Sequence, residues 1–239
     1  MRAVFRREFR AFFTNPVGYG VLAVLFCFSG DFFHQYNLVS NMYGGSTDLT
    51  AVYISLFTVT LLAAPFLTMH LFSEEKRQKT DQALLTAPVS LTGIVLGKFL
   101  ATLTLFAIGV SITLVYAVII ALHATPDWLV IIGNYLGLLL IGGLILSIGV
   151  FISSLTESQI IAAISTLAIS VLLISIDFLP TFFSSSAFVA TIVEFLSISS
   201  RYGDFTSGLI QYDNILFFLT AQALFIFLTV RVLDSKRWN

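Results

Sequence analysis

The sequence predicts an all-α integral membrane protein with six transmembrane helices. Of its 239 residues, 57% are hydrophobic and only 10% are charged, whereas a soluble domain carries about 25% charged residues. The mean hydropathy is +0.96. Long apolar runs, each able to cross a hydrocarbon core of about 30 Å as a helix, alternate with short polar segments. Because no linker or internal repeat divides the chain, we expect residues 1–239 to form one membrane domain.

The first fifteen residues predict a helix that lies along the membrane surface. Phenylalanines recur there at helical spacing, namely Phe5, Phe9, Phe12 and Phe13. Most of the arginines fall on the other side of the helix, and they are Arg2, Arg6, Arg7 and Arg10. A basic amphipathic helix of this kind lies along an anionic cytoplasmic leaflet. A signal peptide also has a basic start, but no small-x-small cleavage site follows, and the next residues are bulky. We therefore expect Pro16 to begin the first transmembrane helix.

Six runs are long enough to be the transmembrane helices. They are Val17–Phe33, Val52–Leu71, Ile94–Leu122, Leu129–Leu155, Ser158–Ile176 and Ile215–Leu233. A further uncharged segment, Phe178–Val193, is interrupted by Pro180 and three serines, and as a seventh span it would move the basic C-terminus outside. We interpret it as an external segment that dips into the interface or folds back, which requires protein or water to satisfy its backbone.

The distribution of Lys and Arg predicts that both termini are cytoplasmic. With six spans and a cytoplasmic N-terminus, only Arg201 of the 12 basic residues lies outside. The other basic residues lie inside: Arg2, Arg6, Arg7, Arg10, Lys76, Arg77, Lys79, Lys98, Arg231, Lys236 and Arg237. This asymmetry is a strong positive-inside signal.

A cluster of charged residues joins the second and third spans. It consists of Glu74, Glu75, Lys76, Arg77, Lys79 and Asp81. Charges are costly at the bilayer centre, so this segment must lie in water. Leu84, Leu85 and Val89 follow at about helical spacing, which predicts a short amphipathic helix. Such a helix is suited to docking into a groove on a partner, although an ordinary solvated loop has a similar sequence.

The sequence contains no recognisable catalytic, metal or energy-coupling site. It has no GxxxxGK[ST], HExxH or GxSxG pattern, and the interiors of the spans are nearly free of charge. Ion-coupled transporters usually carry acidic or histidine side chains near mid-membrane. A transporter without either feature must draw its energy from elsewhere, which predicts a separate ATPase. The net charge of −1 gives no indication of nucleic-acid binding.

Two further patterns predict close contacts but leave their partners open. Gly93–Gly97 and Gly133–Gly137 have GxxxG spacing, continued by Gly142, Gly143 and Gly149, which favours helix packing within one subunit or at a dimer interface. The polar junction Ser153–Gln159 lies on the same side as the charge cluster. It is either a second partner contact or a plain turn.

Four stretches resemble ABC-2-type transporter permeases, in the order found in that family. SEEKRQKTDQALLTAPVS with IVLGKFLA resembles the first cytoplasmic loop, and GVFISSLTESQIIAA resembles the junction of spans four and five. FRREFRAFFTNPVGYGVLAV and ISSRYGDFTSGLIQYDNILFFL are similar to the gliding-motility-associated branch. Many members have Gly-Thr where this chain has Lys79-Thr80, and an acidic residue near Gln82.

The resemblance implies a role for each part of the chain. Residues 1–15 would be an elbow helix, residues 73–93 a coupling loop with its helix, and residues 178–214 an external re-entrant region. The protein would be the permease subunit of an exporter in the bacterial cytoplasmic membrane, with no catalytic site and no bound cofactor of its own. ATP and Mg²⁺ would bind a partner ABC ATPase, and a second permease subunit, identical or homologous, would complete the transporter.

The resemblance also implies which residues contact the ATPase. They are Glu74, Glu75, Lys76, Arg77, Lys79, Thr80, Asp81, Leu84 and Leu85, with Glu157 as a secondary contact. Reversing the charges of Lys76 and Arg77 should impair ATPase association and leave membrane insertion intact. Two alternatives are a membrane scaffold or assembly protein without ATP, and an ion-coupled secondary transporter. The substrate is not indicated by the sequence.

Overall fold

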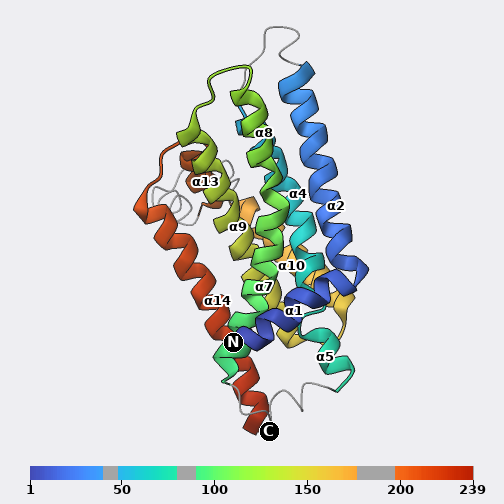
Figure 1. The fold of residues 1–239 in the computed structure, drawn as a ribbon. Coiled ribbons are helices and arrows are strands. Elements are labelled where there is room, and N and C mark those ends of the chain that lie inside the picture. The colour runs from blue at the N-terminus through green and yellow to red at the C-terminus, as the bar shows by residue number, and fades with distance from the viewer. Residues whose placement is uncertain (40–47, 80–89, 177–196, 239) are drawn as a thin grey trace.

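The computed structural model is a bundle of helices, described for residues 1–39, 48–79, 90–176 and 197–238 (Figure 1). These residues contain no β-strand. Five helical segments are long and apolar enough to cross a membrane. Their bounds are Pro16–Val39, Thr50–Arg77, Leu91–Ala121, Trp128–Leu155 and Tyr212–Ser235. The helices in them are α2 (Pro16–Phe33), α4 (Thr50–Thr68), α7 with α8 (Leu91–Val110 and Ile112–Ala121), α9 (Trp128–Leu155) and α14 (Tyr212–Trp238). The predicted fifth span is a shorter apolar helix, α10 (Gln159–Ser175). The all-α prediction is confirmed, and the count of six spans stays a prediction.

Polar side chains cap the start of four of the apolar helices. In each case the side chain of the residue before the helix accepts a hydrogen bond from a backbone N–H of the first turn, which has no partner within the helix. The capping residues are Asn15 for α2, Ser90 for α7, Asp127 for α9 and Ser158 for α10. Pro16 directly follows its cap, as predicted, because proline lacks the N–H that the first turn leaves unpaired.

Helix α9 is the centre of the bundle. It packs against α4, α7, α10, α13 (Ile198–Thr206) and α14. Its glycines provide the space for these contacts. A Cβ atom on Gly142 would lie 2.6 Å from Phe106 Cζ of α7, and one on Gly143 would lie 2.9 Å from Gln222 Nε2 of α14. The glycine pattern of this helix therefore serves packing within the subunit, the first of the two predicted alternatives.

The predicted third span is divided into two helices at Ser111. Its hydroxyl donates to the carbonyl of Ala107 at 2.6 Å and lies 3.1 Å from the hydroxyl of Tyr135 on α9. A serine that bonds the preceding turn in this way often bends a helix. The second part, α8, therefore follows α7 with a break that the uniformly apolar sequence does not indicate.

Short elements lie at the two ends of the bundle (Figure 1). Helix α1 (Arg2–Thr14) crosses one end, where α5 (Ser73–Arg77) and the last turns of α14 also lie, and we call this the α5 end. Helix α13 lies towards the other end and buries Tyr202 and Phe205 against α9. The predicted external segment Phe178–Val193 lies outside the described residues.

A polar contact joins α13 to the start of α14. Arg201 donates to Asn214 Oδ1 at 2.8 Å, and Asn214 donates to Asp204 Oδ2 at 2.8 Å. The Arg201 guanidinium also lies 4.2 Å from the centre of the Phe217 ring, a cation–π geometry. The one basic residue predicted to lie outside is therefore held within the fold by the amide of Asn214 and the ring of Phe217.

Candidate functional site

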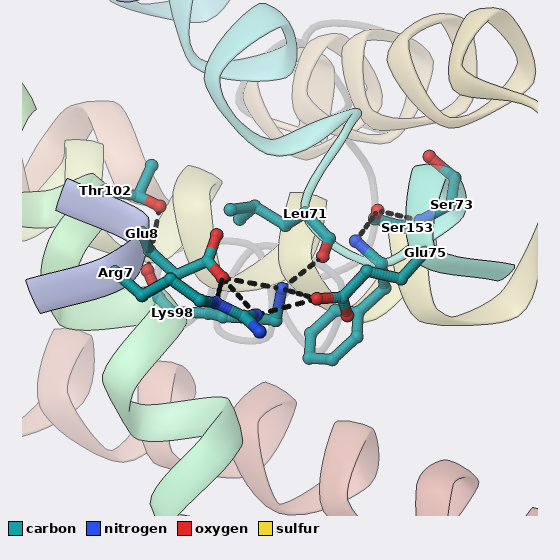
Figure 2. Close-up of polar contacts among 9 residues, drawn as sticks. Arg7, Glu8, Leu71, Ser73, Glu75, Lys98, Thr102 and Ser153 are labelled. Carbon is teal, nitrogen blue, oxygen red and sulfur yellow. Dashed lines mark hydrogen bonds and ion pairs between the residues drawn. The ribbon is translucent and has the colours of Figure 1, made fainter. Parts of the chain in front are cut away.

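The most heavily charged contact of the described chain lies at the α5 end, around Lys98 of α7 (Figure 2). The side chain of Lys98 is 1% exposed. Its Nζ lies 3.2 Å from Glu8 Oε1 of α1 and 3.0 Å from Glu75 Oε1 of α5. It also donates to the carbonyl of Leu71, which precedes α5, at 2.6 Å. One ammonium group thus connects three helices that are far apart in the sequence.

Arg7 completes this arrangement from the surface. Its Nε donates to Glu8 Oε1 at 3.0 Å, and a terminal nitrogen donates to Glu75 Oε1 at 2.8 Å. The side chain of Arg7 is 53% exposed, whereas that of Glu8 is 10% exposed. We call Arg7, Glu8, Glu75 and Lys98 the α5-end ion network. It contains two cations and two carboxylates, so its formal charges sum to zero.

The electrostatics of Glu8 follow from this arrangement. Burial raises the pKa of its carboxyl, but Lys98 and Arg7 lower it by more, so the pKa lies below the ordinary value. Glu8 is therefore ionised at neutral pH inside a largely buried contact. Removing one partner of such a contact leaves an uncompensated charge, which is the costly change.

A second set of contacts ties the segment before α5 to the end of α9. The Ser153 hydroxyl accepts from the backbone N–H groups of Phe72 at 3.1 Å and Ser73 at 3.2 Å (Figure 2). It also donates to the Met69 carbonyl at 3.2 Å. Lys76 Nζ donates to the Ser154 carbonyl. The last carbonyls of a helix lack partners in the helix and favour a cation, so Lys76 stabilises this end of α9.

Part of the polar junction after α9 therefore makes contacts within the chain. Ser153 and Ser154 are buried and bind the α5 segment. Glu157 is exposed. A partner that touches this junction would meet Glu157 rather than the serines.

Two glycines of α7 allow α1 to pack closely at this end. A Cβ atom on Gly97 would lie 3.0 Å from Val4 Cβ and 3.1 Å from the Met1 carbonyl. A Cβ atom on Gly93 would lie 3.4 Å from the Met1 nitrogen. Small residues let helices approach, and here the approach brings Glu8 of α1 to Lys98 of α7.

The predicted partner-contact residues fall into three groups. Glu75 and Lys76 are bound within the chain, as described above. Glu74 is half-buried, and Arg77, Lys79 and Glu157 are exposed. The remaining ones, with the predicted amphipathic helix that follows them, lie outside the described residues: Thr80, Asp81, Leu84 and Leu85.

The backbone at Lys79 has a left-handed conformation. Its φ is 55°, it follows the last turn of α5, and it is the position at which the resemblance noted above leads one to expect glycine. Glycine favours this left-handed conformation, because it has no Cβ to clash with the backbone. The end of α5 is thus a position where lysine adopts a conformation that suits glycine.

Replacing Lys79 with glycine should make α5 more stable. The left-handed conformation costs a non-glycine residue about 1 kcal/mol, and that strain disappears in Lys79→Gly. Amide hydrogen exchange of the α5 segment should become slower. The matched control is Gln78→Gly, because Gln78 has a φ of −86° and gains nothing from glycine. Faster exchange in both variants would contradict this explanation.

Sequence reasoning missed the α5-end ion network, although its signals are visible. Lys98 is the only charged residue between Ser90 and Thr125, and a charge within an apolar helix needs a partner. Glu8 is the only acidic residue of α1 and lies one helical turn before Phe12, on the buried side. What the sequence does not show is that these two side chains face each other.

The four arginines of α1 keep the exposure that the sequence predicts. Arg2, Arg6 and Arg10 are exposed, and Arg7 is partly covered through Glu75. Within the described chain, no group of three or more His, Cys, Asp or Glu side chains is arranged to hold a metal ion.

The comparison with known families gives one finding. The model of the family described as "ABC-2 family transporter protein" matches residues 2–238. No curated protein matches the chain. The matched range includes α1, both polar contacts at the α5 end and all five long apolar segments.

Proposed function

The chain belongs to the ABC-2 transporter family, and from this premise we propose that it is the membrane subunit of an ATP-driven exporter. It is a multi-pass permease component of an ABC transporter, a class whose members work with an ABC ATPase. The proposal adds the direction of transport and the way in which the ATPase acts. The observation that supports it most is buried Lys98, which links the surface around α5 to α1 and to the long helix α7.

We infer that the ATPase docks on the exposed side chains at the α5 end. Arg77, Lys79 and Glu157 are exposed there, and Glu74 is half-buried. Thr80, Asp81, Leu84 and Leu85 belong to the same proposed surface on sequence grounds. Glu75 and Lys76 have a different part in this proposal. They attach the docking segment to the bundle, so that a displacement of α5 moves the helices behind it.

The proposed mechanism is a rigid-body movement driven from outside the chain. ATP and Mg²⁺ bind the ATPase subunits, whose closure would displace α5. Through Glu75 and Lys98 the displacement reaches α7, and through Ser153 and Lys76 it reaches α9. A second permease subunit, identical or homologous, would provide the other wall of the path. In this proposal the α5 end faces the cytoplasm, where the ATPase and its nucleotide are, and residues 178–214 form the external region.

The test separates docking from folding by reversing one exposed charge. Lys76 is bound internally, so the informative variant is Arg77→Glu alone. Tagged protein purified from its native membrane should bring down an ABC ATPase. We expect Arg77→Glu to lower the recovered ATPase at least severalfold, since like charges across an interface repel. Membrane insertion and yield should not change.

The matched control is Arg231→Glu, a reversal of another exposed arginine, on α14. It should leave the recovered ATPase as in the wild type. If no ATPase is recovered with the wild type, or if the reconstituted chain alone moves solute without nucleotide, the proposed function is wrong. Equal recovery with Arg77→Glu and with the wild type would contradict the docking surface only.

A further inference from the structure

We propose that anionic phospholipid headgroups bind the arginine face of α1, and that this binding holds α5 in the position seen here. The first part of the proposal, lipid binding to α1, requires no ATPase. The second half deepens the proposed function and rests on it for its significance, because α5 is the segment on which the ATPase is proposed to dock.

Helix α1 has three different faces. Val4, Glu8 and Phe12 point into the bundle, and Glu8 and Phe12 are buried. Phe5, Phe9 and Phe13 form a second, half-buried face. Their rings are in contact, with centroids 5.8 Å and 5.2 Å apart, and Phe13 continues to Tyr19 of α2 at 5.7 Å. This face is an apolar ladder that leads to the first membrane-spanning helix.

The third face of α1 is basic. Arg2, Arg6, Arg7 and Arg10 line one open hollow along the helix, together with Ala3, Phe5, Ala11 and Thr14. No carboxylate lies among these lining residues. Only Arg7 of the four is ion-paired within the described chain. The hollow therefore presents guanidinium groups that suit a phosphate, since arginine donates in a planar fork to such groups.

The combination of the two faces selects a phospholipid over a soluble anion. Only Asn15 separates α1 from Pro16, which begins the first apolar helix, so α1 lies at the level where an apolar span meets water. There the phenylalanine ladder can contact acyl chains while the arginines contact headgroups. A soluble phosphate would use the basic face only. An anionic phospholipid uses both faces.

The same helix is connected directly to α5. Arg7 donates to Glu75 of α5, and Glu8 contacts Lys98, which also contacts Glu75. Lipid that holds α1 against the leaflet therefore keeps Arg7 and Glu8 within reach of their partners. Because coupling between two sites is reciprocal, a displacement of α5 would also alter the lipid contact.

The experiment uses the full chain without an ATPase, in nanodiscs of phosphatidylcholine with increasing phosphatidylglycerol. Bound phosphatidylglycerol is counted by native mass spectrometry, and hydrogen exchange is followed over α5. The wild type should prefer phosphatidylglycerol, and its α5 amides should exchange more slowly as the anionic fraction rises. Each arginine at an anionic surface adds roughly a fivefold preference, so Arg6→Gln with Arg10→Gln should reduce the preference roughly 25-fold.

Two further variants separate lipid binding from its effect on α5. Glu75→Gln retains every arginine but loses the ionic links of α5 to Arg7 and Lys98, so it should bind phosphatidylglycerol and lose the slowed exchange of α5. Arg231→Gln removes an exposed arginine outside the hollow and should behave as the wild type. The single variants Arg6→Gln and Arg10→Gln should each give part of the loss seen in the double variant.

Three results would overturn the proposal. An unchanged lipid preference in the double variant would remove the arginine face as the binding site. Equal slowing of α5 exchange by inorganic phosphate in neutral nanodiscs would show that a soluble anion suffices. Lipid binding without any change at α5 would refute the link between the two. Since no ATPase is present, none of these results bears on the Arg77→Glu test of the proposed function.

Discussion

Replacing Lys98 with methionine should destabilise the folded protein by about 3–5 kcal/mol, the usual cost of removing one partner from a buried ion pair. Lys98 is 1% exposed, and its ammonium group contacts both Glu8 and Glu75. Methionine has a similar length but no charge, so both carboxylates lose their buried cation. Thermal unfolding of the purified protein in detergent should show a markedly lower transition temperature.

The control removes the carboxylate charges as well. In Lys98→Met with Glu8→Gln and Glu75→Gln, no unpaired buried charge remains, and most of the lost stability should return. A triple variant that is as unstable as the single one would show that packing, and not charge, accounts for the effect.

Acid should destabilise the wild-type protein by protonating the carboxyl of Glu8. The pKa of Glu8 is below its ordinary value of 4.5 in the folded protein. The stability that its ion pairs contribute is therefore fully present above about pH 4.5 and is lost as the pH falls through the lower, folded pKa. The melting temperature of the wild type should fall more steeply over this range than that of the triple variant. Parallel curves would contradict a stabilising role for ionised Glu8.

Gly149→Ala should also destabilise the fold, by about 1–3 kcal/mol, because it overpacks the contact between α9 and α4. A Cβ atom on Gly149 would overlap the Thr68 hydroxyl and lie 2.7 Å from Thr68 Cβ. Thr68 is fully buried, and its hydroxyl bonds the Ala64 carbonyl at 3.2 Å. The two helices must therefore separate to admit the methyl group. The melting temperature in detergent measures the loss.

Gly20→Ala is the matched control for this substitution. Gly20 also lies within an apolar helix, α2, but a Cβ atom there meets nothing within 4 Å. Alanine should be neutral at this position or stabilise by up to about 1 kcal/mol, as expected from helix propensity. If both variants lose the same stability, the close packing of Gly149 is not the cause.

The two ends of the bundle differ in how well the sequence predicted them. At the α5 end, the charge cluster and the arginines of α1 were found from composition and spacing alone. The roles of two of those residues were not, because Glu75 and Lys76 have the same local sequence character as exposed Arg77. At the other end, Ile198, Tyr202 and Phe205 recur at helical spacing and are buried, but the spacing does not indicate that their partner is α9.

By itself, the sequence determined that this protein is helical, that its long apolar segments suit a membrane and that Pro16 begins the first of them. Each of these properties depends on residues near one another in the chain: apolar length, a capping side chain or a proline. Only the tertiary structure decided which glycines contact which helices and that Lys98 joins Glu8 to Glu75. The physical reason is that a charged residue or a glycine in an apolar segment indicates only that some group packs against it. Its identity depends on how α1, α5 and α7 meet, across separations of up to 90 residues.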